Sequence, residues 1–367
     1  SLHDALPISE LRLTIRAAFP AEQIRRRIFQ PDVLQHVADD FGMMMRDALT
    51  VDLGASLHAY QTFHASLPEK IDLLSKALIE QKVDLVLADI PYLTLAAAQK
   101  AGIPSIALCS LNWADILEHS LLQVTSTKPK NTDAQPSISA ELALAGAKIV
   151  REIRDIYQQV NHFLLPAPSM PMSTLTNTLA IGPVCTPGVM RRADLANNTQ
   201  VANDAWFVLV GMGGMPFDLN PDQWPTHMLG KPLHHIVADT VAQNSSHPQV
   251  IAETQTGLSY SDLVATADLI LTKPGYGMFA EAAAAGVPVL YVERRDWPEA
   301  QALTDWLKAV AHCTEISTEV LHRGDFADEM RKLLELGRYD PIPATGNMQA
   351  ASLLARYLRS TKQACRE

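Results

Sequence analysis

The stretch that decides the fold of this chain reads ADLILTKPGYGMFAEAAAAGVPVLYV, from Ala267 to Val292. Its apolar run Leu269–Leu271 is too short for a helix and is typical of a strand buried on both faces. The run Met278–Ala285 predicts a helix, because alanine has the highest intrinsic helix propensity. Gly286 is placed to end that helix, and Pro288 leads into a second apolar strand. The stretch is therefore predicted to fold as strand, turn, helix and strand.

The turn before this helix carries the features of a phosphate site. Gly275 and Gly277 bracket it, and glycine alone adopts positive φ freely and brings no Cβ against a ligand. The N-terminus of the helix offers free N–H groups and the positive end of the helix dipole. Glu281 follows within the first turns, where its carboxylate can reach a ribose hydroxyl. This layout predicts a nucleotide-sugar site.

The same segment resembles the donor-binding motif of GT-B glycosyltransferases, including the family that makes lipid II and the family-28 C-terminal domain. It is also similar to the glycosyltransferase-like half of plant-type L-arabinokinases, through the run KPGYGMFAEA from Lys273 to Ala282. Three further stretches resemble that half: Arg46–Asp52, Val83–Leu93 and Ile103–Trp113. The resemblance implies an α/β chain with the GT-B fold, in which two Rossmann-like, doubly wound parallel-sheet lobes face a cleft. It also implies that the glycine turn holds a diphosphate and that Glu281 binds the ribose of a UDP-sugar.

The length of 367 residues suits two domains better than one. We expect an acceptor-side lobe over residues 10–183, a nucleotide-sugar-binding lobe over 184–345, and a terminal helix over 346–367 that packs back on the first lobe. Strands and helices alternate in the first half, which favours a parallel sheet. Within it we expect a helix over residues 141–163 and an irregular, proline-rich segment over 164–171.

Residues 1–9 (SLHDALPIS) match what a common sequencing-adapter oligonucleotide encodes in one reading frame. We therefore expect them to be foreign to the natural protein, which would begin further upstream. Leu11–Arg16 then resembles the second strand of a doubly wound sheet. The first strand and the loop after it, which faces the acceptor in this family, would be missing. Loss of activity in this truncated form is one consequence of that hypothesis.

The composition limits the function classes. A formal charge of −10 and a pI near 5.6 argue against a general nucleic-acid or anionic-membrane surface. No apolar run approaches the length of a transmembrane helix. The four cysteines are scattered, so they predict neither a metal site nor a disulfide framework, and the cytoplasm is the expected compartment.

Two features of the second half are further candidates for donor binding. Gly213 and Gly214 follow an apolar strand, where their backbone would approach the diphosphate. The alternative is a tight turn with no ligand. Lys273 is either a phosphate ligand or a solvated lysine. Tyr276 either lines the cleft or packs beneath the turn.

The loop after Val292 is the last donor-side candidate. The resemblance implies that it carries acids and amides that bind the donor sugar, for which Asp296, Glu299 and Gln301 are the candidates. Arg294 or Arg295 could bind phosphate with two parallel hydrogen bonds. Without the resemblance, this would be a charged surface loop.

The first half offers acceptor-side candidates. Asp89 ends a predicted buried strand, the edge at which doubly wound sheets place ligands, and is the candidate catalytic base. A turn-capping role is the alternative for Asp89. Asp52, Asn112 and Trp113 are further acceptor-side candidates, and Trp113 could stack on a sugar.

These observations predict a glycosyltransferase that moves a sugar, most simply from a UDP-sugar, to an unknown acceptor hydroxyl. The donor is a substrate, so no cofactor is expected, and no metal constellation is found. Two rivals remain open: a catalytically silent sugar-nucleotide-binding or regulatory module, and a nucleotide-sugar epimerase or hydrolase on the same fold.

Overall fold

The computed structural model describes residues 11–21, 24–25, 32–47, 49–126, 138–213 and 219–364. Residues 1–9 and Gly214, both discussed above, lie outside these ranges. The chain divides into two compact units. The first unit comprises Ser1–Met45, Val51–Gly182 and Thr345–Glu367, and the second comprises Arg46–Thr50 and Pro183–Ala344.

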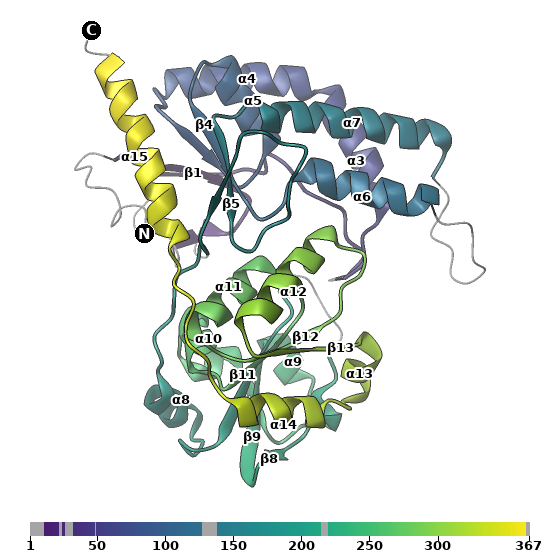
Figure 1. Ribbon diagram of the computed structural model, residues 1–367, viewed down its shortest axis with the longest axis vertical. Coiled ribbons are helices and arrows are strands. Elements are labelled where there is room, and N and C mark those ends of the chain that lie inside the picture. The colour runs from purple at the N-terminus through teal and green to yellow at the C-terminus, as the bar shows by residue number, and fades with distance from the viewer. Residues whose placement is uncertain are drawn as a thin grey trace. The chain divides into compact units, whose positions relative to one another are not determined.

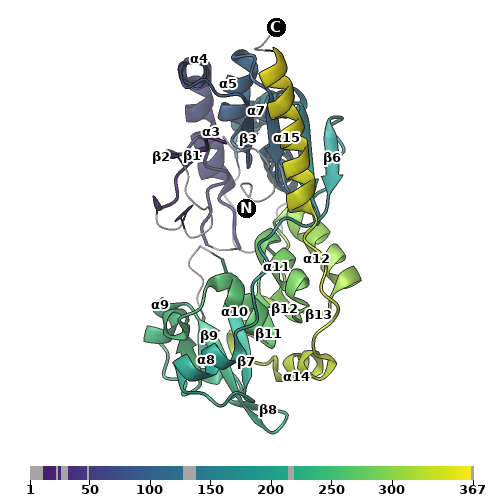
Figure 2. The same ribbon diagram turned by 90° about the vertical axis from the view of Figure 1, so that its left-hand side faces the viewer.

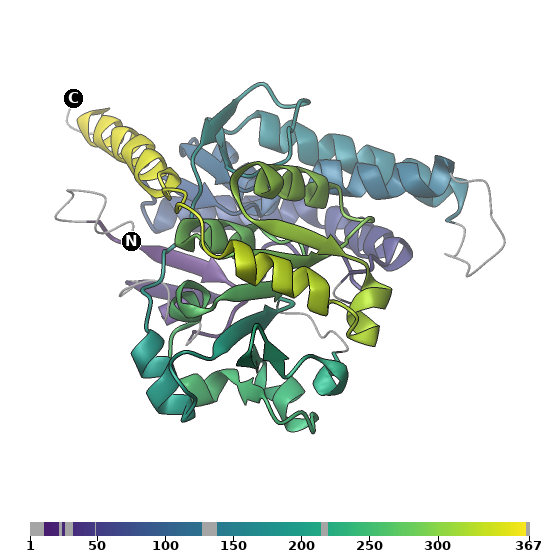
Figure 3. The ribbon, with the colours of Figure 1, turned by 60° about the horizontal axis from the view of Figure 1, so that its bottom comes forward.

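The first unit is a layered α/β domain (Figure 1). Four parallel strands form one sheet in the order β3-β4-β5-β6, and β1 pairs with β2 in a separate parallel pair. The C-terminal helix, which ends near the mark C in Figure 3, belongs to this unit. The elements are β1 (Thr14–Ala17), β2 (Val33–His36), α3 (Leu53–Ala65), α4 (Leu67–Glu80), β3 (Val86–Ala88), α5 (Tyr92–Lys100), β4 (Ser105–Leu108), α6 (Trp113–Ser126), α7 (Ala140–Gln158), β5 (His162–Pro166), β6 (Thr178–Ile181) and α15 (Gly346–Ala364).

Two strands in this unit have a single partner among the described residues: β1 pairs only with β2, and β3 pairs only with β4. Figure 2 shows β1 and β2 side by side. Leu87, in the middle of β3, is 40% exposed.

The second unit is built around six parallel strands in the order β10-β9-β7-β11-β12-β13, with the short β8 antiparallel to β9. Its elements are α8 (Arg192–Thr199), β7 (Trp206–Gly211), the 3-10 turn η1 (Pro221–Gln223), β8 (His227–Met228), β9 (Lys231–Val237), α9 (Asp239–Gln243), β10 (Val250–Ala252), the 3-10 turn η2 (Glu253–Thr256), α10 (Tyr260–Thr266), β11 (Leu269–Thr272), α11 (Tyr276–Ala285), β12 (Val289–Val292), α12 (Pro298–Val310), β13 (Cys313–Ile316), α13 (Thr318–Arg323) and α14 (Ala327–Leu336).

Both faces of this second sheet are buried. Alternate residues along β11 point to opposite faces: Ile270 joins a core with helices α8, α10, α11 and α12, whereas Leu269 and Leu271 join a core with α13 and α14. A strand covered on both faces needs a continuous apolar run, which is the pattern seen in the sequence. The prediction of strand, turn, helix and strand over 267–292 is confirmed.

Local sequence signals set several helix ends. Asp52 caps α3 by accepting a hydrogen bond from the backbone N–H of Ala55 at 3.0 Å. Pro68 occupies the first turn of α4, where a missing N–H costs nothing, so α3 and α4 are separate helices. Gly286 ends α11 in the left-handed conformation, with φ of 67°.

The prediction for the segment after residue 140 is partly wrong. Helix α7 ends at Gln158, and His162–Pro166 forms β5, where a helix end and an irregular segment were expected. Phe163 and Leu164 are fully buried between β4 and β6, and this tertiary burial outweighs the local proline signal. Pro166 is tolerated because it is the last residue of the strand.

None of the helices in the described ranges combines the length and the apolar character needed to cross a membrane.

His235 on β9 makes the stability of the second unit sensitive to acid. It is fully buried, and its Nε2 donates a hydrogen bond to the carbonyl oxygen of Pro225 at 2.9 Å. Burial lowers the pKa of His235 from 6.5 to about 4. The neutral side chain therefore contributes its full stability above pH 6.5, and this contribution, up to about 3 kcal/mol, is lost as the pH falls toward 4.

We expect the free energy of unfolding in urea to fall between pH 7 and pH 5. In the His235→Gln variant, which retains a side-chain donor, that fall should be smaller by roughly 2 kcal/mol. An equally steep pH dependence in the variant would contradict this assignment. The pKa values of His234 and His64 are also lowered by burial, so a smaller decline should persist.

Candidate functional site

Three neighbouring strands of the second unit end at the same edge of its sheet. β7, β11 and β12 are parallel, with Thr272 paired to Gly211 on one side and to Tyr291 on the other. The hydroxyl of Thr272 donates a hydrogen bond to the carbonyl oxygen of Gly211 at 2.6 Å. The loops that follow these strands therefore lie next to one another at the carboxyl edge, where ligands bind in open α/β sheets.

The glycine turn at this edge leads directly into α11. Gly275 is the N-cap residue with an extended φ of −164°, and Gly277 is the second residue of the helix. Neither glycine has a positive φ, so of the two properties named above only the missing Cβ applies here. Among the described residues, a Cβ on Gly277 would meet no atom within 4 Å, and one on Gly275 would meet only the carbonyl oxygen of Lys273 at 3.9 Å. No described part of the chain therefore requires glycine at either position.

Gly213 and Lys273 lie side by side at this edge. Gly213 has a φ of 80°, which favours glycine, and a Cβ there would lie 3.3 Å from Cε and 3.8 Å from Nζ of Lys273. Burial, with a smaller contribution from the nearby positive charge of Arg294, lowers the pKa of Lys273 to about 8. Lys273 is thus a partly desolvated cation next to a glycine backbone.

Arg294 supplies a second cation. Its side chain is only 7% exposed, lies over the ring of Trp297 at 4.4 Å, and has its Nε 4.0 Å from the Oδ1 of Asp296. Burial lowers the pKa of Arg294, although Asp296, Glu299 and Asp47 oppose this effect. The buried Nε forms no hydrogen bond within the described part of the chain. A buried N–H without an acceptor is costly, so this group is suited to an incoming anion.

The candidate carboxylates and amide that follow β12, in the loop and at the start of α12, differ in their surroundings. Glu299 is buried and accepts a hydrogen bond from the Nε1 of Trp297 at 2.9 Å. Asp296 is exposed, next to Arg294. Gln301 lies on α12 and donates to Asp305 at 2.7 Å. Arg295 is 85% exposed and pairs with Glu293, so only Arg294 of the two arginines faces the edge where Lys273 lies.

Two candidate residues on α11 are engaged within the second unit, Tyr276 by hydrogen bonds and Glu281 by burial. The hydroxyl of Tyr276 accepts a hydrogen bond from the N–H of Val184 at 2.8 Å and lies 3.2 Å from its carbonyl oxygen. This placement corresponds to the alternative of a tyrosine packed at the turn. Glu281 is 6% exposed, and its charge adds to the burial that raises the pKa of Cys185 to about 11.

The acceptor-side candidates all belong to the first unit. Asp89 follows β3 directly and is an exposed residue, although partial desolvation of its carboxyl raises its pKa. Asn112 and Trp113 begin α6: Asn112 accepts a hydrogen bond from the N–H of Asp115 at 2.8 Å, which is a capping contact. The indole Nε1 of Trp113 donates to the Oδ2 of Asp40 at 2.9 Å. The structure thus brings Asp89 and Trp113 together with Asp40, which the sequence analysis missed.

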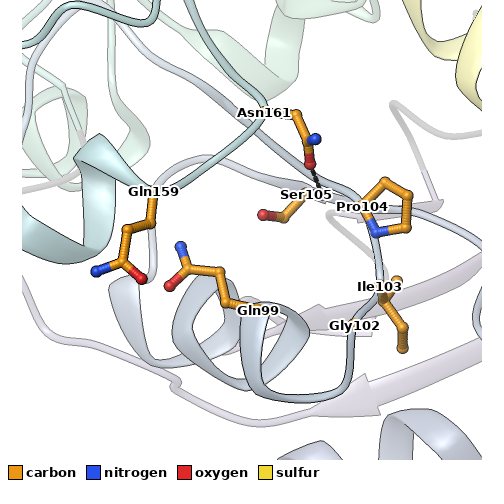
Figure 4. A pocket seen from close by; sticks show the side chains of 7 residues that line it. All are labelled: Gln99, Gly102, Ile103, Pro104, Ser105, Gln159 and Asn161. Carbon is orange, nitrogen blue, oxygen red and sulfur yellow. Dashed lines mark hydrogen bonds between the residues drawn. The ribbon is translucent and has the colours of Figure 1, made fainter.

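Two hollows lie in the first unit. One of about 650 Å³ is bordered by Asp52, the cap of α3. The other, of about 420 Å³, adjoins the amino ends of β4 and β5, so it is at the opposite edge from Asp89. In Figure 4 the amides of Gln99 and Gln159 point toward each other, and Asn161 accepts a hydrogen bond from the N–H of Ser105 at 2.8 Å. None of the predicted site residues lines this second hollow.

Across the described ranges, no three His, Cys, Asp or Glu side chains gather closely enough to hold a metal ion.

Comparison with solved structures defines the class of fold. UGT89C1 from Arabidopsis thaliana, complexed with UDP, is 12% identical over 97% of this chain and 95% of its own, with a TM-score of 0.56. The glycotransferase of kitacinnamycin is 14% identical over 94% of this chain and 91% of its own, with a TM-score of 0.55. UGT71G1 from Medicago truncatula, complexed with UDP-glucose, gives a TM-score of 0.51 at 14% identity, over 96% of this chain and 91% of its own. The chain has the GT-B fold.

At the level of sequence, the chain is similar to the L-arabinokinase of Arabidopsis thaliana. The two are 24% identical over 315 residues, which cover 83% of this chain and 27% of that relative. The chain thus spans about a quarter of the length of the curated relative it matches. No protein-family model matches the chain.

Proposed function

We propose that this protein transfers a sugar from a UDP-sugar to an acceptor hydroxyl, with the donor bound at the carboxyl edge of the second unit's sheet. One observation carries the proposal. Gly275 and Gly277 leave the N-terminus of α11 without side chains at these two positions although no atom of the described residues requires it, and Lys273 and Arg294 lie at the same edge. A diphosphate needs both close backbone approach and positive charge. Complexes of the similar structures UGT89C1 and UGT71G1 with UDP and UDP-glucose support this choice of donor.

In this proposal the second unit acts on the leaving group. As the bond from the anomeric carbon to the diphosphate breaks, negative charge develops on the diphosphate. The N–H groups of α11, the ammonium of Lys273 and the guanidinium of Arg294 stabilise that charge, and they do so without a metal ion. Gly213 lets the backbone approach from the side of β7. The proposal assigns the ribose to Glu281 and the donor sugar to Asp296, with Glu299 and Gln301 as further sugar contacts.

The acceptor is assigned to the carboxyl edge of the first unit, where Asp89 and Trp113 lie. Calorimetry with UDP, UDP-glucose and GDP-glucose tests donor binding, and measurement of released UDP tests turnover. Micromolar UDP binding with UDP release only when an acceptor is present supports transfer. Absence of any nucleotide binding would refute the proposal.

The second candidate function is a sugar-nucleotide-binding module without turnover. The sequence similarity to an L-arabinokinase supports this second function, because that relative is named as a kinase and not as a glycosyltransferase. Binding of UDP-sugars without release of UDP would support this reading. Free sugar released without an acceptor would instead indicate a hydrolase on the same fold, and a changed sugar still attached to UDP an epimerase.

Gly277→Ala gives a test in which stability and binding change in opposite directions. The new Cβ meets no atom of the described residues and lies on a helix, so the variant should be as stable as the wild type or up to about 0.5 kcal/mol more stable. If the diphosphate lies against this turn, the same methyl group should weaken UDP binding by about tenfold. Isothermal calorimetry and urea unfolding measure the two effects.

Gly54→Ala is the matched control. Gly54 is likewise the second residue of a helix, α3, and a Cβ there would meet only the Oδ1 of Asp52 at 3.7 Å. The stability of Gly54→Ala should change as that of Gly277→Ala does, whereas its UDP affinity should equal that of the wild type. Equal UDP affinities for Gly277→Ala and Gly54→Ala would argue against phosphate binding at this turn.

A further inference from the structure

The hollow of about 420 Å³ at the amino ends of β4 and β5, called the amide hollow below, lies entirely in the first unit. Four of the residues that line it are polar: Gln99, Ser105, Gln159 and Asn161 (Figure 4). None of its lining residues carries a charge, and Lys100, which follows Gln99, is paired with Asp72. Small-molecule sites have volumes of about 300–1,000 Å³, so this hollow has room for a small, uncharged ligand.

Hydrogen bonds to the backbone fix the orientation of two of these amides. The Nε2 of Gln99 donates to the carbonyl oxygen of Ile156 at 2.9 Å, so its Oε1 is left as an acceptor for a ligand. The Oδ1 of Asn161 accepts a hydrogen bond from the N–H of Ser105 at 2.8 Å, so its Nδ2 is left as a donor. The protein thus decides in advance which end of each amide a ligand would meet.

Gln159 and Ser105 add groups that can both donate and accept. Gln159 is exposed, and its amide points toward that of Gln99 in Figure 4. Ser105 is 2% exposed, and it belongs to the lining of the hollow. The hollow therefore offers a fixed acceptor, a fixed donor and two adaptable groups. Hydroxyls on adjacent carbons of a sugar match this set, because each hydroxyl donates one hydrogen bond and accepts others.

The carboxyl ends of two helices adjoin the amide hollow. Gln99 lies in the last turn of α5, and Gln159 is the C-cap residue of α7. The carboxyl end of a helix carries a partial negative charge, which disfavours phosphate and carboxylate groups and favours the hydrogen atom of a hydroxyl. The donor edge of the second unit is the opposite case, because Lys273 and Arg294 supply positive charge there. A nucleotide phosphate is therefore unsuited to the amide hollow.

We propose that the amide hollow binds a neutral, hydroxyl-rich small molecule of monosaccharide size. Gln99 accepts a hydrogen bond from one ligand hydroxyl, Asn161 donates to another, and Gln159 and Ser105 complete the contacts. The hollow is at the opposite edge of the sheet from Asp89, so its ligand is not the group assigned to react there. This inference goes beyond the proposed function and does not depend on it.

A nuclear magnetic resonance titration of the full chain tests the site. The side-chain amide signals of Gln99, Gln159 and Asn161 are followed while D-glucose, D-galactose or myo-inositol is added. At least one of the three should shift these signals with a Kd of about 1–10 mM, as expected for a few neutral hydrogen bonds in an open hollow. D-glucuronate should bind about fivefold more weakly than D-glucose. Saturating UDP should leave the affinities unchanged.

Gln159→Leu is the direct variant, since it removes an exposed amide and keeps a side chain of similar length. The affinity for the sugar that binds should fall about fivefold. Gln81→Leu is the matched control: Gln81 is likewise an exposed C-cap glutamine, of α4, and does not line the hollow. Its sugar affinity should stay within about twofold of the wild type.

Ser105→Ala supplies a second test at the buried side of the hollow. It removes the hydroxyl but keeps the N–H that Asn161 accepts, so the sugar affinity should fall several-fold while Asn161 stays in place. A purely structural role for these polar groups would change urea unfolding and leave the sugar affinity of the folded protein unchanged.

The outcomes separate this inference from the proposed function. No shift of these amide signals with any of the three probes at about 50 mM would overturn the site, whatever the UDP measurements give. Equal affinities of Gln159→Leu and Gln81→Leu would place the sugar elsewhere. Binding of D-glucuronate as tight as that of D-glucose would overturn the assignment to a neutral ligand. A protein that binds the sugar here but no UDP would refute the proposed function alone.

Discussion

Replacing Arg294 with methionine is expected to weaken UDP binding about 100-fold. The buried guanidinium would donate charge-assisted hydrogen bonds to the diphosphate, each contributing about 1.5–3 kcal/mol, and methionine keeps much of the apolar stem while removing the donors. Stability should change little, because the substitution also removes a buried Nε without a partner. Loss of the neighbouring charge should raise the pKa of Lys273 from about 8. Calorimetry with UDP at pH 7 measures the affinity.

Arg295→Met provides the control at the adjacent position. Arg295 is 85% exposed and its ion pair with Glu293 is of the surface type, which contributes at most about 1 kcal/mol. UDP affinity should therefore stay within about twofold of the wild type. If both variants bind UDP equally well, the anion does not lie at Arg294. If both lose binding equally, the effect is one of net charge and not of a defined contact.

Gly286→Ala is expected to destabilise the second unit by about 3 kcal/mol or more. The position has a φ of 67°, and a Cβ would lie 2.2 Å from the carbonyl oxygen of Tyr339. That backbone cannot move freely, since the N–H of Tyr339 donates to the carbonyl oxygen of Gly286 at 3.1 Å and the N–H of Ile342 donates to that of Ala283 at 2.9 Å. The substitution therefore combines left-handed strain with a clash against fixed backbone. Urea unfolding measures the loss.

Gly230→Ala separates strain from clash. Gly230 lies in the turn between β8 and β9 with a φ of 76°, and a Cβ there would meet no atom within 4 Å. Only the conformational cost remains, so a loss of about 1 kcal/mol is expected. Equal losses in the two variants would mean that the contact with Tyr339 relaxes without cost.

The sequence predicted the parts of the fold in which local signals and burial agree. The run from Ala267 to Val292 has apolar strands, a helix former between them and a glycine at the helix end, and each element formed where expected. Around residue 160 the signals disagreed: His162–Pro166 reads as a proline-rich segment yet forms a central strand. Pairing with β4 and β6 decided that conformation, and no local pattern reports such pairing.

Candidate residues at the ends of apolar strands could be found from the sequence, because parallel strands present their carboxyl ends at one edge. Asp89 was chosen in this way, whereas Lys273 was chosen as a neighbour of the glycine turn and the loop with Arg294 through the family resemblance. The position of Asp40 next to Asp89 and Trp113 was not predicted, because the preceding strand, Val33–His36, is short and partly polar, so the sequence gives no clear sign that a strand ends there. The adjacent pair Asp39 and Asp40 before Phe41 was the available signal.

By itself, the sequence determined the alternation of strands and helices, the glycine turn and the charges placed around it, since these depend on residue type and spacing. Only the tertiary structure decided which charged and polar groups are paired with one another and which stay available to bind a ligand. It paired Asp39 with Arg16 and Arg295 with Glu293, and it left the Nε of Arg294 and the hydroxyl of Tyr60 buried without a hydrogen bond inside the described part of the chain. Hydrogen-bond partners and desolvation come from residues distant in sequence, so they exist only once the chain is packed.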